Sequence, residues 1–195
     1  MKNKATRTLL VLIAFLAYGA QVEAHTFGAE GAGLLAGVVH PFIGLDHLLA
    51  MLAVGIWAVQ LGGAAIWRVP LAFVGMMSFS ALMAAYGPAV PLLEVAIALS
   101  VLVLGGLVLC AARLPVGLDV LLIGLLAITH GYAHGLEIPE AGSALLYGMG
   151  FVVSTALLHL MGVMLGWVAR HNHWLTRAGG LAIALTGLYL TSVAA

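Results

Sequence analysis

The stretch HPFIGLDHLLAM, residues 40–51, places two histidines and an aspartate inside a long apolar segment. The chain around it is 64% hydrophobic and only 7% charged, whereas a soluble domain has about 25% charged residues. So little polar surface cannot cover a core in water, and the solvent that suits the whole chain is a lipid bilayer. The sequence therefore predicts an all-α polytopic membrane protein.

Apolar runs of about twenty residues recur along the chain and predict a bundle of about six transmembrane helices. The first run is longer than one span needs, so Pro41 is expected to begin the membrane helix, with 31–39 as a shorter or re-entrant piece. With three helices in each half, the halves can be inverted relative to one another, as in many transporters. The expected spans are 34–61, 66–86, 90–112, 116–137, 142–168 and 174–193.

The first 24 residues are expected to be a cleaved signal peptide, followed by a single transmembrane helical domain over 25–195. Basic residues precede an apolar run of about a dozen residues, and small residues follow it at the cleavage positions. An uncleaved membrane helix is the alternative, although the run is short for one. Cleavage after Ala24 would make His25 the mature N-terminus, where an amino group beside an imidazole is a ready chelator.

Basic residues set the expected orientation. With the mature N-terminus outside, every arginine after the signal peptide falls on the cytoplasmic side, as the positive-inside rule requires. We therefore expect a multi-pass protein of the bacterial inner membrane with both mature termini in the periplasm. The arginines concerned are Arg68, Arg113, Arg170 and Arg177.

The fourth expected span carries HGYAHGLE, residues 130–137. His130, His134 and Glu137 stand at i, i+4 and i+7, which is one stripe of a helix. Two imidazoles at this spacing can bind one metal ion, and a nearby carboxylate can complete the site or hold a histidine tautomer.

The first expected span offers a second set. His40 and His47 are seven residues apart and are expected to share a helix face, with Asp46 beside His47. Ionisable residues inside a membrane normally face the bundle interior and have a partner or a function. Together the two spans predict a site for a divalent transition metal ion, with the ligands His25, His40, Asp46, His47, His130, His134 and Glu137.

Other polar residues extend this prediction. Glu94 and His159 are expected to lie on the pathway of the ion, although a hydrogen bond to a neighbouring helix explains His159 equally well. Glu30 and Glu140 are expected to capture the ion outside. Imidazole and carboxylate ligands without thiolate suit nickel, cobalt or zinc better than copper(I), magnesium or calcium.

The two motifs together resemble the HupE/UreJ family of hydrogenase and urease accessory membrane proteins, and the resemblance covers the whole mature chain. It implies a nickel or cobalt permease that supplies metalloenzymes. The larger nickel–cobalt permeases separate the histidine from the Asp-His pair by one residue fewer, so their ligand geometry cannot be copied. The matching motif positions are His40, Pro41, Gly44, Asp46, His47, His130, Gly131, His134, Gly135 and Glu137.

The expected function is uptake of Ni²⁺, alternatively Co²⁺ or Zn²⁺, into the cytoplasm, without enzymatic activity or an organic cofactor. Besides the bilayer and the ion, expected partners are cytosolic metallochaperones or metalloenzyme maturation proteins. A near-zero net charge argues against nucleic acid. Two alternatives stay open: a membrane metal sensor or chaperone that does not transport, and an electron carrier with haem held by two histidines.

Overall fold

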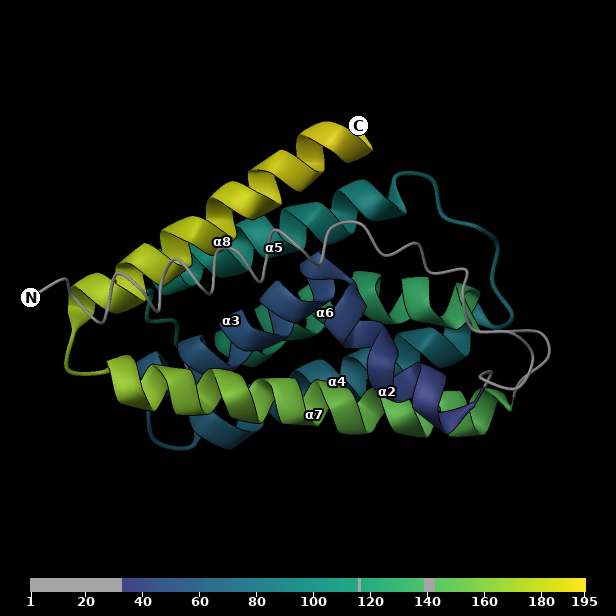
Figure 1. The fold of residues 1–195 in the computed structure, drawn as a ribbon, viewed down its shortest axis with the longest axis horizontal. Coiled ribbons are helices and arrows are strands. Elements are labelled where there is room, and N and C mark those ends of the chain that lie inside the picture. The colour runs from purple at the N-terminus through teal and green to yellow at the C-terminus, as the bar shows by residue number, and fades with distance from the viewer. Residues whose placement is uncertain (1–32, 116, 139–142) are drawn as a thin grey trace, which may run out of the picture.

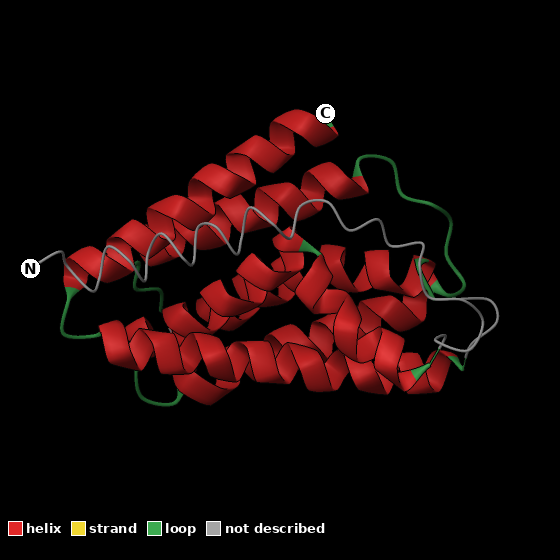
Figure 2. Cartoon of the chain, in the orientation of Figure 1, coloured by secondary structure: helices red, strands yellow, loops and turns green. Residues whose placement is uncertain are grey.

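The computed structural model describes residues 33–115, 117–138 and 143–195, and the regular structure within these ranges is entirely helical (Figures 1 and 2). The predicted signal peptide, His25, Glu30 and Glu140 lie outside the described residues. The helices run in the order α2 (Leu34–Ile43), α3 (Leu45–Leu61), α4 (Ala65–Ala84), α5 (Leu93–Cys110), α6 (Leu118–Leu136), α7 (Ala144–Ala169) and α8 (His173–Ala194).

Five of these helices, α4 to α8, are each long and apolar enough to cross a membrane. The pair α2 and α3 also qualifies when taken together, and it is bent by 83° at the break between them. The described part of the chain therefore has up to six spans, which confirms the predicted all-α membrane bundle.

The first span breaks at a different residue from the one predicted. Pro41 lies inside α2 rather than at the start of a helix, and the chain turns at Gly44, whose backbone is extended with φ −72° and ψ 113°. Because proline has no N–H, it cannot donate to the carbonyl of Gly37 one turn earlier. The hydroxyl of Ser154 on α7 lies 3.4 Å from that carbonyl oxygen, and it is shared with the carbonyls of Gly150 and Phe151 on its own helix at 3.1 Å and 3.0 Å.

The helices pack mainly in three pairs, α5 with α8, α4 with α6, and α3 with α7, and α2 also lies along α7. Small residues allow the close approach of neighbouring helices. A Cβ atom at Gly131 would overlap the carbonyl oxygen of Met77, and one at Gly135 would overlap that of Ala81. The backbones of α6 and α4 are therefore in direct contact.

This pairing bears on the predicted inversion of two halves. If the halves are related, α3 corresponds to α6, α4 to α7 and α5 to α8. Replacing each helix by its counterpart then turns the pair α3·α7 into the pair α6·α4, and it leaves the pair α5·α8 as it is. The observed pairs are thus the ones that two related halves would form. The relation between the halves itself stays a prediction.

All arginines in the described ranges lie at one end of the bundle, where α3 joins α4, α5 joins α6 and α7 joins α8 (Figure 1). At this end Arg68 donates to Asp119 through Nη2 at 2.6 Å and through Nε at 3.1 Å. Asp119 is fully buried and also accepts hydrogen bonds from the backbone of Gly117 and Val120. The ion pair ties the beginning of α4 to that of α6.

Candidate metal centre

The predicted stripe on α6 forms one wall of a buried polar cluster at the end of the bundle opposite the arginines. His130 and His134 are both buried, and Glu137 follows the last residue of α6 with its side chain half exposed. A helix repeat of 3.6 residues places all three on the same side. The predicted alignment of this motif is confirmed.

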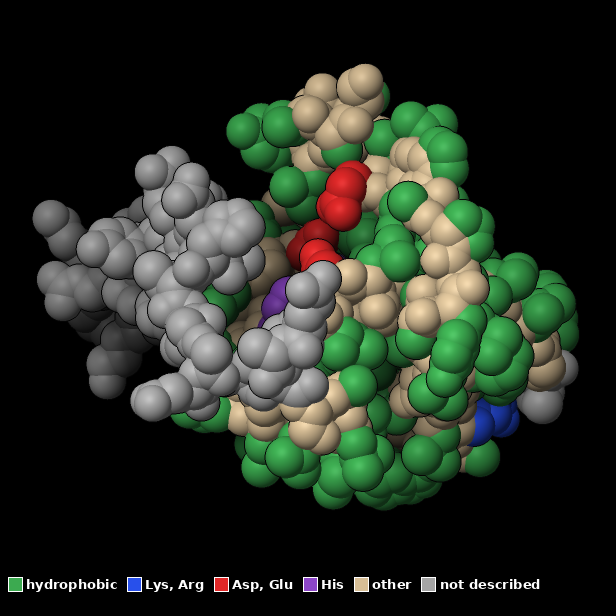
Figure 3. Space-filling model, turned by 90° about the vertical axis from the view of Figure 1, so that its right-hand side faces the viewer, with side chains coloured by type: hydrophobic (Ala, Val, Ile, Leu, Met, Phe, Trp, Pro, Cys, Tyr) green, Lys and Arg blue, Asp and Glu red, His purple; other side chains and the backbone are tan. Residues whose placement is uncertain are grey.

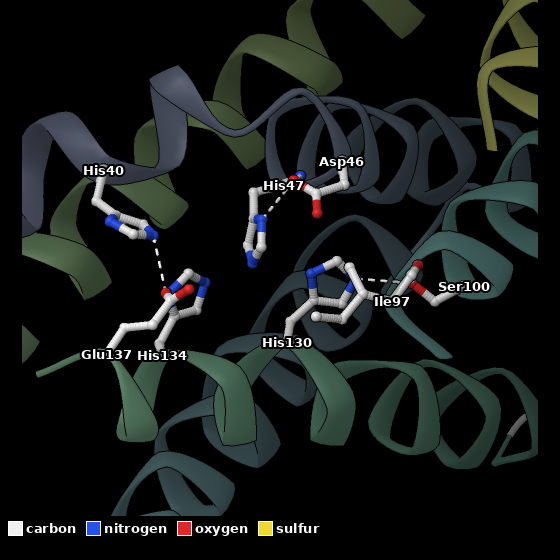
Figure 4. Close-up of polar contacts among 8 residues, drawn as sticks. All are labelled: His40, Asp46, His47, Ile97, Ser100, His130, His134 and Glu137. Carbon is white, nitrogen blue, oxygen red and sulfur yellow. Dashed lines mark hydrogen bonds and ion pairs between the residues drawn. The ribbon is translucent and has the colours of Figure 1, made fainter. Parts of the chain in front are cut away.

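The other wall comes from the bend between α2 and α3. His40 lies on α2 and His47 on α3, so the prediction that they share one helix face is wrong. The bend nevertheless brings their ring centroids to 6.2 Å. It also sets the rings of His40 and His47 at 4.8 Å and 4.2 Å from that of His134, and His47 at 4.8 Å from His130 (Figure 4).

One carboxylate oxygen bridges two of these histidines. The Oε2 atom of Glu137 lies 3.2 Å from Nε2 of His40 and 3.4 Å from Nδ1 of His134. One ligand atom from each of the three residues lies within 4.8 Å of the others. The ligands of one ion are at most about 4.2 Å apart, twice a metal–nitrogen bond. Small side-chain movements would therefore close this set around an ion.

Asp46 acts on His47 rather than on the centre of the cluster. Its Oδ1 atom lies 2.6 Å from Nδ1 of His47 and also accepts the backbone N–H of that residue at 2.7 Å. A carboxylate beside Nδ1 keeps the imidazole proton on that nitrogen, so Nε2 carries a free lone pair. Gly44 leaves room for this contact, because a Cβ atom there would lie 2.9 Å from the same carboxylate oxygen and would push it aside.

Ser100 on α5 fixes the tautomer of His130 in a similar way. Its hydroxyl lies 2.7 Å from the carbonyl oxygen of Ile97 and 2.7 Å from Nε2 of His130 (Figure 4). A hydroxyl has one proton, so both contacts are hydrogen bonds only if Ser100 donates to Ile97 and accepts from the imidazole. His130 then carries its proton on Nε2 and has a lone pair on Nδ1. Sequence reasoning missed Ser100.

Buried ring nitrogens in the cluster are consequently left without a hydrogen-bond partner among the described residues: Nε2 of His47, Nδ1 of His130 and both nitrogens of His134. Of these, Nδ1 of His134 has the carboxylate oxygen of Glu137 at 3.4 Å. Burying an unpaired polar atom costs about 1–3 kcal/mol. Neutral imidazoles that pack together with unpaired lone pairs form a site prepared for a cation that prefers nitrogen.

Carboxylates surround the outer side of this cluster. Within the described ranges the acidic residues that are not fully buried are Asp46, Glu94 and Glu137. Glu94 lies in the first turn of α5, within electrostatic reach of Asp46 and His47. The end view shows acidic side chains beside a histidine in a hollow (Figure 3). Their negative charge attracts cations toward the imidazoles.

The other histidines of the described ranges lie elsewhere. His159 is buried on α7, where its ring packs against that of Phe73 rather than among the rings of the cluster. His171 and His173 are exposed at the arginine end of the bundle.

Comparisons with known proteins agree with the motifs. The model of the HupE / UreJ protein family matches residues 12–190. Protein HupE of Rhizobium leguminosarum bv. viciae is 41% identical over 190 residues, an alignment that covers 96% of this chain and 97% of that protein. No solved structure matches the chain.

Proposed function

Because the chain belongs to the HupE/UreJ family, we propose that it is a permease that carries a divalent transition metal ion across the bacterial inner membrane into the cytoplasm. Nickel is the proposed ion and cobalt the alternative, since imidazole and carboxylate ligands suit both. The ion would supply metalloenzymes of the hydrogenase or urease type, handed on by cytosolic metallochaperones or maturation proteins.

The observation that carries this proposal is the set of unpaired nitrogens on His47, His130 and His134. Each is buried among helices inside an apolar bundle, where a phenylalanine or leucine would avoid the cost of burying a polar atom. Asp46 and Ser100 orient two of the rings so that a lone pair is free. A cation that moves through the cluster would offer each of these nitrogens a partner in turn.

The arrangement suggests an order of events. Glu94 and Glu137 would attract the ion at the outer end, where carboxylates stand in the hollow. His40, His134 and Glu137 would then bind it, since they lie within 4.8 Å of one another. His47 and His130 would accept it next, because their rings follow that of His134 toward the middle of the bundle.

The membrane potential can drive this movement without a further energy source. A dication that moves inward through about 100 mV gains about 4.6 kcal/mol, on the order of a thousand-fold accumulation. Every arginine of the described ranges lies at the end opposite the site. If that end faces the cytoplasm, the site opens to the periplasm, as import requires.

Uptake by reconstituted protein separates this function from the alternatives. Liposomes that contain the full chain and carry an inside-negative potential should accumulate ⁶³Ni²⁺, whereas empty liposomes should not. A sensor or chaperone would bind nickel without accumulation inside. An electron carrier with haem would show a Soret absorbance when purified.

A further inference from the structure

His159 is a buried histidine outside the cluster described above. Its side chain is only 2% exposed on α7, and neither ring nitrogen has a hydrogen-bond partner among the described residues. A neutral imidazole has one donor and one acceptor, and burying each unpaired costs about 1–3 kcal/mol. Packing alone therefore does not account for a histidine at this position.

The ring of Phe73 lies between His159 and the outer cluster. Its centroid is 5.7 Å from that of His130 and 5.2 Å from that of His159. Since His130 is itself 4.8 Å from His47, the rings form a continuous series from the cluster into the bundle. Only the Phe73 ring in this series offers no ligand atom.

The contact between Thr155 and Met77 shows how deep in the bundle His159 lies. Thr155 stands one turn before His159 on α7, and Met77 stands one turn after Phe73 on α4. The Thr155 hydroxyl lies 3.9 Å from the Met77 sulfur, and both residues are buried. Because α4 and α7 run in opposite directions (Figure 1), this pair lies one turn nearer the outer end than His159 and Phe73.

His130 lies at the level of Met77. Gly131, next to His130 on α6, approaches the Met77 carbonyl oxygen so closely that a Cβ atom would overlap it. His159 is therefore deeper than His130 by about one helical turn, about 5.4 Å. The thioether sulfur of Met77 and the hydroxyl of Thr155 therefore lie at the level of His130, one turn above His159.

We infer that His159 is a second, inner binding position for the transported divalent transition metal ion. The ion passes from His130 by the edge of the Phe73 ring to His159, with Met77 and Thr155 as additional weak donors on the way. With two imidazoles one helical turn apart, the ion exchanges its ligands in small steps, and the free-energy cost of removing its water is spread over those steps. This inference rests on the proposed transport function.

A cysteine at this position makes the inner site visible with Co²⁺ as the probe. Cys110 is the chain's only cysteine and is replaced first (Cys110→Ser). In that background, His159→Cys should give a cobalt–thiolate charge-transfer band in the near ultraviolet when Co²⁺ is added to the purified full chain. Leu160→Cys is the matched control, because the adjacent side chain is 51% exposed on the outside of the bundle. It should give no band.

Transport supplies the second measurement. His159→Leu should lose most Ni²⁺ uptake into liposomes while it keeps the affinity of the unaltered outer cluster for Co²⁺. A band in His159→Cys that is absent from Leu160→Cys supports the inner position. Wild-type uptake in His159→Leu, or no band in a His159→Cys protein whose outer cluster binds Co²⁺, would overturn it and leave the permease function standing. Lack of uptake by the wild-type chain would instead contradict the permease function, and the band would still report on inner binding.

Discussion

The Oδ1 atom of Asp46 lies 2.6 Å from Nδ1 of His47, so the aspartate holds one nitrogen of the adjacent imidazole and leaves the other unpaired in the bundle interior. The chain makes this contact at a bend of 83° between α2 and α3. At this break in a membrane span, two neighbouring residues thus hold an imidazole in one orientation with a nitrogen free, as the proposed metal centre requires.

Removing this carboxylate should weaken metal binding without removing a ring. Asp46→Ala is expected to lower the affinity for Ni²⁺ about 10–100-fold, as loss of a partner behind a ligating histidine typically does. Asp46→Asn should lose less, because its amide oxygen can still accept from Nδ1–H. Titration calorimetry on the purified chain measures both, and equal affinities for wild type and Asp46→Ala would contradict the orienting role.

Ser100 should matter for the same reason on His130. Ser100→Ala removes the acceptor that keeps the proton on Nε2, so we expect about tenfold weaker Ni²⁺ binding and a mixture of tautomers in the ¹⁵N spectrum of the histidine rings. Ser80→Ala is the matched control, because this buried serine donates only to the backbone carbonyls of Met77 and Ile128. If Ser100→Ala binds Ni²⁺ with the same affinity as Ser80→Ala, Ser100 is not a positioning residue.

Close packing of α6 against α4 should make Gly131 intolerant of a side chain. A Cβ atom there would overlap the Met77 carbonyl oxygen, and Gly131→Ala is expected to lower stability by about 1–3 kcal/mol through overpacking. A Cβ atom at Gly148 on α7 would meet no atom of the described residues within 4 Å, so Gly148→Ala should be neutral or stabilising. Thermal unfolding in detergent compares the two, and a Gly131→Ala midpoint at the wild-type value would count against this contact.

The ion pair at the opposite end should contribute to stability rather than to binding. Arg68→Ala leaves the buried Asp119 without its charged partner, and because the Arg68 side chain is itself 31% exposed we expect a loss of about 1–3 kcal/mol. The double variant Arg68→Gln/Asp119→Asn removes both charges and should recover part of that loss. Unfolding midpoints measure the effect. A double variant less stable than Arg68→Ala would show that the unpaired charge is not the cause.

The spans and the stripe on α6 could be predicted because both depend on short-range periodicity. His130, His134 and Glu137 align through the helix repeat alone. The break in the first span could not be placed in this way, because proline and glycine both interrupt helices. Gly44, rather than Pro41, is the turning point, where a Cβ atom would crowd the carboxylate of Asp46.

Ser100 and the position of His159 depend on contacts between distant segments. Ser100 stands between Leu99 and Val101 on a helix that is apolar all round, so nothing local distinguishes its hydroxyl. It meets His130 only because α5 packs beside α6. In the same way, the ring of Phe73 separates His159 from the cluster through the packing of α4 and α7.

The most direct test of the proposed metal centre is a Ni²⁺ titration of the purified full chain beside His47→Ala and His173→Ala. His173 is the control, since it is exposed at the end of the bundle opposite the cluster. We expect tight binding by wild type and His173→Ala, and a loss of affinity in His47→Ala. Binding that is unaffected by His47→Ala would contradict the metal centre and return the buried imidazoles to a structural role.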